Sequence, residues 1–458
     1  MQQSDRRRIL ISLLLAILAP FGLAAVASAE KPGPGADLED VYLWLHANPE
    51  LSLKEVNSSA LMAAELETLG FEVTTRLGDD YVKQKAMAEQ GVVRDQVGGY
   101  GVVGVLRNGE GPTVMIRADM DALPLIERTG KDYASTKRGE TWTGVENGVM
   151  HACGHDIHMT SWIGTARRLV AEKDAWSGTL VMIAQPAEEI GLGAVAMISD
   201  GLFSRFPTPD YNIALHVDSS RPAGVVSFLG GFTYANVDSV DITVFGTGGH
   251  GAYPNLSKDP IVAASSMVTA LQTLVSRTVD PQRPAVVTVV SFQAGAKHNI
   301  IPDQAKLLLT VRSYDDTTRQ QLLDGIERIA KAQAASFGLP EPEIFSDPDF
   351  TPASFNDPEL TERARAAVAA EIGAENVMDA KPVMGGEDFA RYGRTPEDIP
   401  SLQFRLGAVD REFYEKAKDG PLGLPSLHSP IFAPEYELAI ETGVTSLSAT
   451  AMALYNQN

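Results

Sequence analysis

The spacing of apolar and polar residues changes along the chain and predicts an order of elements. Stretches 37–46 and 58–69 have the apolar spacing of amphipathic helices, whereas 79–99 is polar and is interpreted as an insertion. Strands are predicted at 71–75, 101–106, 113–117, 178–185 and 211–215, and a helix at 159–172. This alternation of strand and helix predicts an α/β fold, with a mostly parallel sheet and helices on both of its faces.

The pattern changes after residue 222. Residues 232–245 alternate between apolar and polar, as in a half-exposed strand. The elements predicted next are a helix at 259–277, strands at 284–293 and 305–313, and a helix at 317–336. This order predicts a small α+β domain with an antiparallel sheet, inserted into the first domain.

The final stretch of the chain returns to the first pattern, with helices predicted at 358–372 and 435–455 and a strand at 400–407. At 458 residues the chain is too long for one ordinary core. We therefore predict a larger domain from 30–225 and 340–458, and an inserted domain from 226–339.

The N-terminal residues have the three parts of a signal peptide. A basic run at 6–8 precedes an apolar run at 9–26, and Ala27-Ser28-Ala29 forms a small-residue cleavage site. A retained membrane anchor is the alternative, but Pro20 and Gly22 interrupt the apolar run and favour removal. We expect residues 1–29 to be cleaved, and the mature protein to be periplasmic or secreted and free of the membrane.

Charge and cysteine content narrow the possible partners. The formal net charge of -21 argues against nucleic acid or anionic lipid as a partner. The chain has one cysteine, so it forms no internal disulfide. In an oxidising compartment a free thiol is a liability unless it is buried or bound to a metal.

That cysteine lies in the stretch on which the functional interpretation depends, residues 150–158. The stretch also holds three of the eight histidines and an aspartate. Cys153 and His155 are two residues apart, so in an extended turn both can face one metal ion. The alternative is the start of a helix whose histidines share one polar face.

Further ionisable residues follow three predicted strands. Asp119 and Asp121 follow the strand at 113–117, and Glu188-Glu189 follows the strand at 178–185. The carboxyl ends of strands are where open α/β sheets place their sites. Neighbouring carboxylates at a strand end face opposite ways, so one can bind a metal while the other takes a proton from water.

Two isolated histidines complete a possible ligand set. His216 ends the strand at 211–215, and His428 lies in a distant turn. With Cys153, His155 and Glu189 they make five candidate ligands, enough for two metals. Taken singly, each histidine is more often structural than a ligand, and Asp119 and Asp121 could orient ligands or cap the following segment.

A set of short motifs carries a family resemblance. They are RADMDALP at 117–124, HACGHD at 151–156, QPAEE at 185–189, GGHGAYP at 248–254, GEDF at 386–389 and the isolated His428. Together, and in this order, they resemble the two-metal amidohydrolase and peptidase family of aminoacylase, acetylornithine deacetylase and hippurate hydrolase. The branch they resemble holds hippurate hydrolases and plant hydrolases of indole-acetyl amino acids.

The resemblance implies a role for each candidate residue. The implied metal ligands are Cys153, His155, Glu189, His216 and His428. Glu188 matches the general base, and Asp119 matches an aspartate that supports the metal site. Arg117 stands where many relatives carry a histidine ligand. His250 matches a histidine that reaches a neighbouring active site across a dimer.

Two further residues, Asn299 and Arg312, resemble lid residues that hold the substrate carboxylate. The resemblance also implies that the inserted domain is a lid and dimerisation domain, so a homodimer is expected, with monomer and tetramer left open. Two divalent metal ions are implied, with zinc, manganese, cobalt and nickel all compatible with these ligands.

The predicted function is a metal-dependent amidohydrolase that cleaves an N-acyl amino acid into a carboxylic acid and an amino acid. Glu188 would take the proton of a metal-activated water, and His250 would help to stabilise the oxyanion. Arg312 would pair with a free substrate carboxylate. The alternatives are a metallo-carboxypeptidase or dipeptidase acting on short peptides, and an inactive metal-bound binding protein.

Overall fold

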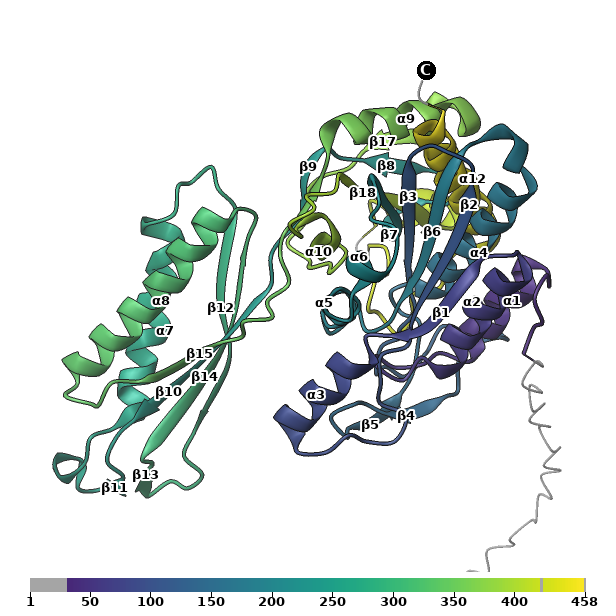
Figure 1. Ribbon diagram of the computed structural model, residues 1–458. Coiled ribbons are helices and arrows are strands. Elements are labelled where there is room, and N and C mark those ends of the chain that lie inside the picture. The colour runs from purple at the N-terminus through teal and green to yellow at the C-terminus, as the bar shows by residue number, and fades with distance from the viewer. Residues whose placement is uncertain (1–30, 421–422, 457–458) are drawn as a thin grey trace, which may run out of the picture.

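The computed structural model describes residues 31–420 and 423–456, so the predicted signal peptide lies outside the described residues. The described chain forms a large unit around an eight-stranded sheet and a small unit around a four-stranded sheet. Figure 1 shows the small unit beside the large one, with extended segments running between them. These segments contain β9 (Gly231–Tyr234) and β16 (Ser354–Asn356), which pair antiparallel.

The large sheet has the strand order β1-β2-β6-β3-β7-β18-β8-β17. The central strands β6, β3, β7 and β18 are parallel, while β2 and β8 run antiparallel to their inner neighbours. The predicted mostly parallel sheet is confirmed. The strands are β1 (Glu72–Leu77), β2 (Gly101–Asn108), β3 (Thr113–Asp119), β6 (Gly178–Gln185), β7 (Tyr211–Pro222), β8 (Val226–Phe228), β17 (Val377–Asp379) and β18 (Ser401–Val409).

Helices cover both faces of this sheet, as predicted. Because side chains alternate along a strand, Val114 and Ile116 of β3 enter one core while Met115 enters the other. The first face packs against α1 (Leu38–Ala47), α2 (Val56–Thr68), α4 (His155–Ala171), α9 (Pro358–Ile372) and α12 (Tyr436–Tyr455). The second packs against α5 (Gly193–Ser199), α6 (Leu202–Arg205) and α10 (Ala390–Gly393). Among the described helices, none combines the length and apolar character needed to cross a membrane.

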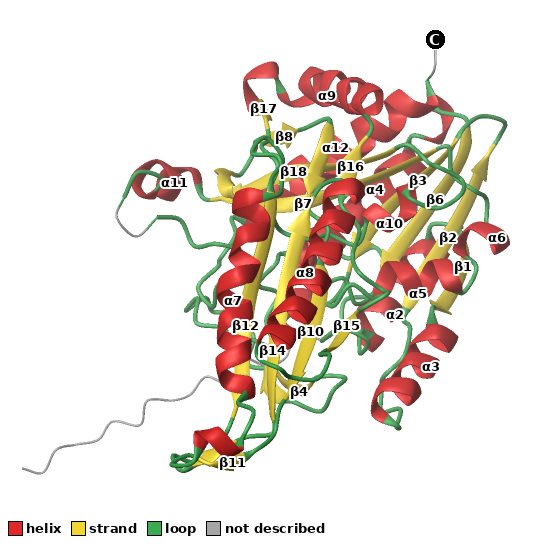
Figure 2. Cartoon of the chain, turned by 90° about the vertical axis from the view of Figure 1, so that its left-hand side faces the viewer, coloured by secondary structure: helices red, strands yellow, loops and turns green. Residues whose placement is uncertain are grey.

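The small unit has an antiparallel sheet of order β12-β14-β10-β15. Figure 2 shows its two helices on the face turned away from the large unit. Its elements are β10 (Asp238–Phe245), α7 (Pro260–Arg277), β12 (Ala285–Ala294), β14 (Gln304–Ser313), α8 (Asp316–Ser336) and β15 (Glu343–Ser346). The strand pairing differs from the predicted bounds 226–339 of the inserted domain. Strand β8 lies within those bounds but pairs in the large sheet, and β15 lies beyond them but pairs in the small sheet.

Short elements extend both units. In the small unit, β11 (Gly249–His250) pairs with β13 (Ile300–Ile301) at the end remote from the linking segments (Figure 1). The others are β4 (Arg138–Glu140), β5 (Glu146–Gly148), α11 (Arg411–Ala417) and the single 3-10 turns Lys173–Ala175, Pro254–Leu256 and Ala374–Asn376.

Three element predictions need correction. The polar stretch 79–99 contains a helix, α3 (Asp79–Gln90), which buries only Val82 and Ala86 and so lacks a visible apolar stripe. The single strand predicted at 232–245 is divided into β9 and β10, because the chain crosses there from one unit to the other. His216 does not end its strand, since β7 continues to Pro222.

Candidate metal centre and active-site cavity

The central strands bring the predicted site residues to one edge of the large sheet. Strands β6, β3 and β7 are adjacent and parallel, so their carboxyl ends meet. Asp119 ends β3, Glu188 and Glu189 follow β6, and His216 lies in β7. On all three strands the polar side chains share the face opposite the larger helical core.

Cys153 and His155 reach this edge from the start of α4. Gly154 between them has φ +79°, and a Cβ at this position would lie 3.1 Å from the side chain of Val217. Glycine is therefore required where α4 approaches β7. A helix does begin in this stretch, at His155, but His151 precedes it, and His155 and His158 are both buried.

The predicted ligands lie close enough together to share metal ions. Cys153 Sγ is 3.7 Å from His216 Nε2, and His155 Nε2 is 4.0 Å from Glu189 Oε1. His428, whose ring is about half exposed, places Nε2 3.5 Å from Glu189 Oε2. Cys153 belongs to two of the possible groups of donors, one with His155 and His216 and one with Glu189 and His428. Donor separations of roughly 3.3–3.8 Å are those around a zinc-sized ion with bonds of 2.0–2.3 Å.

The hydrogen bonds of the histidines fit a metal at this position. His155 donates from Nδ1 to the carbonyl oxygen of Asp121 at 2.7 Å, and His216 donates from Nδ1 to that of Val217 at 2.7 Å. Each ring then presents the lone pair of Nε2. Within the described residues, the buried atoms His155 Nε2 and Glu189 Oε1 have no hydrogen-bond partner. A divalent cation would satisfy both atoms.

His158 is a supporting residue and not a further ligand. Its Nδ1 donates to Asp119 at 2.5 Å, and its Nε2 accepts from the backbone N–H of Val217 at 2.9 Å. Both ring nitrogens are therefore in use. Burial alone would raise the pKa of Asp119, but Arg117, His155 and His158 together outweigh burial and hold that pKa well below its usual value.

The turn that carries Glu188 and Glu189 is held by hydrogen bonds from its backbone to two buried carboxylates. Ala187 has φ +53°, and its N–H donates to the buried Glu55 carboxylate at 2.8 Å. The Asp121 carboxylate accepts from the backbone N–H groups of Glu188 and Glu189 at 3.0 and 3.1 Å. Asp121 therefore orients the turn, one of the two roles that the sequence left open for it.

Glu188 has the surroundings of a general base. Its carboxylate lies 3.9 Å from His155 Nε2 and forms a close group with Glu387 and Asp388. Burial, followed by repulsion from Glu387, raises the pKa of Glu188 well above the usual carboxyl value. A carboxylate that holds a proton more tightly is a better acceptor in a reaction near neutral pH.

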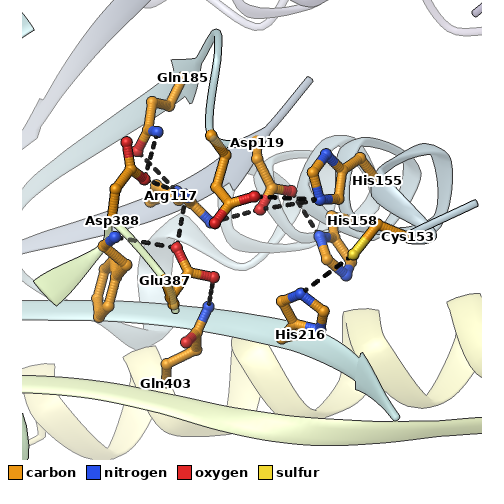
Figure 3. Close-up of polar contacts among 12 residues, drawn as sticks. Arg117, Asp119, Cys153, His155, His158, Gln185, His216, Glu387, Asp388 and Gln403 are labelled. Carbon is orange, nitrogen blue, oxygen red and sulfur yellow. Dashed lines mark hydrogen bonds and ion pairs between the residues drawn. The ribbon is translucent and has the colours of Figure 1, made fainter. Parts of the chain in front are cut away.

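A buried cluster around Arg117 was missed by sequence reasoning. Figure 3 shows its guanidinium between three carboxylates. It donates to Asp119 at 2.5 Å, Glu387 at 3.0 Å and Asp388 at 3.1 Å, and also to Gln185 at 2.9 Å. The sequence showed GEDF at 386–389 as a motif but gave no partner for it.

A cavity of about 570 Å³ opens above these groups. Cys153, Glu188, Glu189, His216 and His428 line it from the large unit, and Arg312 of β14 lines it from the small unit. Sequence reasoning also missed Tyr234 and Arg405 in its wall. Polar residues within an otherwise apolar strand, such as Arg405 in β18, were the available signal.

His250 and Asn299 do not lie in this cavity. Both are exposed at the far end of the small unit, where the N–H of Gly251 donates to the carbonyl oxygen of Asn299 at 2.9 Å. The chain therefore brings these two predicted residues to one another, but not to the cavity of the same copy.

The donor atoms converge without satisfying one another, and a carboxylate beside them is placed to accept a proton. This combination, on an open α/β sheet, defines the class of metal-dependent hydrolases. Residues 115–418 match the family model of peptidase family M20/M25/M40, so the chain belongs to that family. The predicted resemblance is confirmed.

Relatives named as hydrolases or peptidases agree with this assignment. The chain is 37% identical over 359 residues to a hippurate hydrolase of Campylobacter jejuni, covering 78% of this chain and 85% of the relative. It is 35% identical over 381 residues to thermostable carboxypeptidase 2 of Saccharolobus solfataricus, covering 81% and 87%.

Among solved structures, a dinuclear metal-binding peptidase of Bacillus subtilis is 29% identical. It has a TM-score of 0.71, and the match covers 92% of this chain and 98% of that one. The protein is thus a hydrolase of amide bonds that uses divalent metal, and the alternative of an inactive binding protein is set aside.

Proposed function

We propose that the protein cleaves N-acyl amino acids into a carboxylic acid and an amino acid. The observation that carries this proposal is the position of Arg312. Its side chain lines the same cavity as Glu188 and the metal donors, and in the described chain it forms no ion pair with a carboxylate. A free substrate carboxylate would bind there while the amide bond reached the metal centre.

The chain supplies each proton transfer that the reaction needs. Bound divalent ions supply Lewis acidity, which lowers the pKa of water and polarises an amide carbonyl. Glu188 accepts the proton of the attacking water and delivers it to the departing amine nitrogen. Asp121 fixes the backbone that carries Glu188, and Arg312 fixes the substrate at its carboxylate end.

A metallo-carboxypeptidase acting on short peptides is the second candidate. It is favoured by the similarity to the Saccharolobus solfataricus carboxypeptidase, since Arg312 would serve a peptide carboxylate equally well. The two candidates differ in the group on the acyl side of the amide bond, which is a protonated amine in a dipeptide.

The test is a substrate panel with metal analysis. We expect hippurate and N-acetyl amino acids to be cleaved in a chelator-sensitive reaction that Glu188→Gln slows by about 10²-fold or more. Glu146→Gln, at an exposed carboxylate in β5, is the matched control and should retain activity. Cleavage of dipeptides alone would favour the peptidase, and absence of any cleavage by metal-loaded protein would overturn the proposal.

We further propose a homodimer in which His250 and Asn299 of one copy complete the cavity of the other. Their exposure together, away from the cavity of their own copy, supports this arrangement. The variants His250→Ala and Glu188→Gln should each be nearly inactive alone. When they are dissociated and reassociated together, half of the dimers are mixed and each mixed dimer has one intact site, so the mixture should regain about a quarter of the wild-type activity. Failure to complement, with normal folding of both, would contradict it.

Export and metal identity are the remaining parts of the proposal. We propose that residues 1–29 direct export and are removed, which N-terminal sequencing of the mature protein would test. The native ions are drawn from zinc, manganese, cobalt and nickel, because thiolate, imidazole and carboxylate donors suit all four. Elemental analysis of protein purified without added metal would identify them.

A further inference from the structure

Arg405 is a charged residue in the cavity wall with no role in the reaction described above. It lies in the middle of β18, whose other residues are buried, and is partly buried itself. In the sheet it is directly opposite His216 on β7, so the two side chains leave the sheet on the same face. Arg405 is therefore adjacent to the metal centre and opens into the same cavity.

The protein gives this guanidinium little to bind. Among the described residues, its contacts are one long hydrogen bond, 3.4 Å to the carbonyl oxygen of Thr233, and the ring of Tyr234, 5.0 Å from its Cζ. Arg117, on the same face of the sheet, has three carboxylate partners. A partly buried cation without a carboxylate is costly, so a function is needed to explain its place in a central strand.

The acidic residues of the cavity wall do not provide that partner. They are Glu188, Glu189, Asp218, Glu387 and Asp388. None of them forms an ion pair with Arg405 or Arg312 in the described structure. Asp218, for example, accepts instead from the N–H and hydroxyl of Ser220 at 2.8 and 2.6 Å. The cavity therefore presents two unpaired guanidinium groups, one from each unit.

We infer that Arg405 binds a second carboxylate of the substrate, so that the preferred substrates are N-acyl amino acids with two acidic groups. This inference rests on the proposed function, in which Arg312 holds the first carboxylate. The second carboxylate can belong to the side chain of the amino acid or to a dicarboxylic acyl group. Either is a planar anion that a guanidinium binds with two parallel hydrogen bonds.

The experiment compares pairs of substrates that differ only in the second carboxylate. N-benzoyl-glutamate against N-benzoyl-glutamine tests the amino-acid side, and N-succinyl-glycine against its terminal amide tests the acyl side. In one of the two pairs, kcat/KM of the wild-type enzyme should favour the diacid by roughly 10- to 100-fold, the effect of one hydrogen-bonded charge pair. Arg405→Gln should remove that preference, and Arg405→Lys should restore part of it.

Arg411→Gln is the matched control. Arg411 likewise donates to a backbone carbonyl oxygen at 3.4 Å, that of Ala223, but it lies outside the cavity wall. Its variant should keep the wild-type preference. Equal rates within both pairs for the wild type, or an Arg405→Gln variant that slows both members of a pair equally, would overturn the inference. Absence of cleavage of all four compounds and of hippurate would instead overturn the proposed function.

Discussion

Two buried charged clusters lie next to each other at the edge of the large sheet, and they differ in how completely they are paired. In the Arg117 cluster every strong charge meets an opposite charge or an amide, including the Gln403 amide that donates to Glu387 at 2.7 Å. The Cys153 cluster consists of Cys153, His155, Glu189, His216 and His428. In it, His155 Nε2 and Glu189 Oε1 are buried without a hydrogen-bond partner among the described residues. Asp119 lies between the two clusters (Figure 3).

The difference separates structural from functional charge. The Arg117 cluster is closed, because its charged groups bind one another and need no ligand. Such a cluster holds neighbouring strands in register. The Cys153 cluster is open, because it keeps buried donor atoms close together without hydrogen-bond partners. The desolvation of these atoms costs free energy that a bound ligand would recover. The same reasoning distinguishes Arg117, which has carboxylate partners, from Arg405, which has none in the part of the chain that the structure describes.

The largest effect, on kcat, is expected at Glu188, the proposed general base beside the metal donors. Glu188→Gln should lower kcat by about 10²- to 10⁴-fold, because the proton of the attacking water loses its acceptor. Metal content should stay normal, since Glu189 and not Glu188 is the assigned ligand. Hydrolysis assays with elemental analysis check both, and a variant that keeps wild-type turnover would contradict the mechanism.

The closed cluster should instead respond in stability. Arg117→Met leaves three buried carboxylates without their cation, and the free energy of unfolding should fall by about 3–5 kcal/mol. Arg107→Met, which breaks an exposed pair with Glu72 on the neighbouring strands, should cost at most about 1 kcal/mol. Urea unfolding of chelated protein measures both. Equal losses would show that the Arg117 cluster is not structural.

A second closed network predicts a pH effect. Burial lowers the pKa of His46, but hydrogen bonds to Asp156 and Glu127 outweigh burial and raise that pKa to about 9. The stabilisation is therefore complete below the unfolded pKa of about 6.5 and is lost as pH rises through 9. Over that window, chelated wild-type protein should lose up to about 3 kcal/mol more than His46→Gln. Parallel pH profiles of the two proteins would contradict this.

The smallest effect is expected at His158, which connects the clusters by binding both Asp119 and the N–H of Val217. His158→Gln should weaken metal affinity by about 10- to 100-fold, the usual effect of losing a residue that orients the metal site. Competition with a chromogenic chelator measures the change. An unchanged metal affinity would show that His158 stabilises the fold and does not orient the metal site.

The sequence predicts those parts of the molecule that depend on neighbours along the chain. Apolar periodicity placed β3, β6 and α12 within two residues of their observed bounds. Helix α3 was missed, since it buries two residues only and its polar surface conceals the helical period.

The site divides in the same way. The open cluster was predictable because its motifs contain the residue types of metal ligands. The closed cluster was not, because Arg117 and Glu387 are 270 positions apart and neither type suggests the other. Arg405 was missed for a related reason. An arginine within a buried strand is a signal in the sequence, but it indicates a function only when the structure shows that it has no carboxylate partner among the described residues.

The central claim, that the Cys153 cluster binds divalent metal for catalysis, is tested most directly by cobalt substitution. Wild-type protein loaded with Co²⁺ should show a thiolate-to-cobalt charge-transfer band and cleave an N-acyl amino acid. Cys153→Ser should lose the band and most of the bound metal, with the closed cluster and the fold intact. A Cys153→Ser protein that retains the band, the metal and the activity would contradict the account.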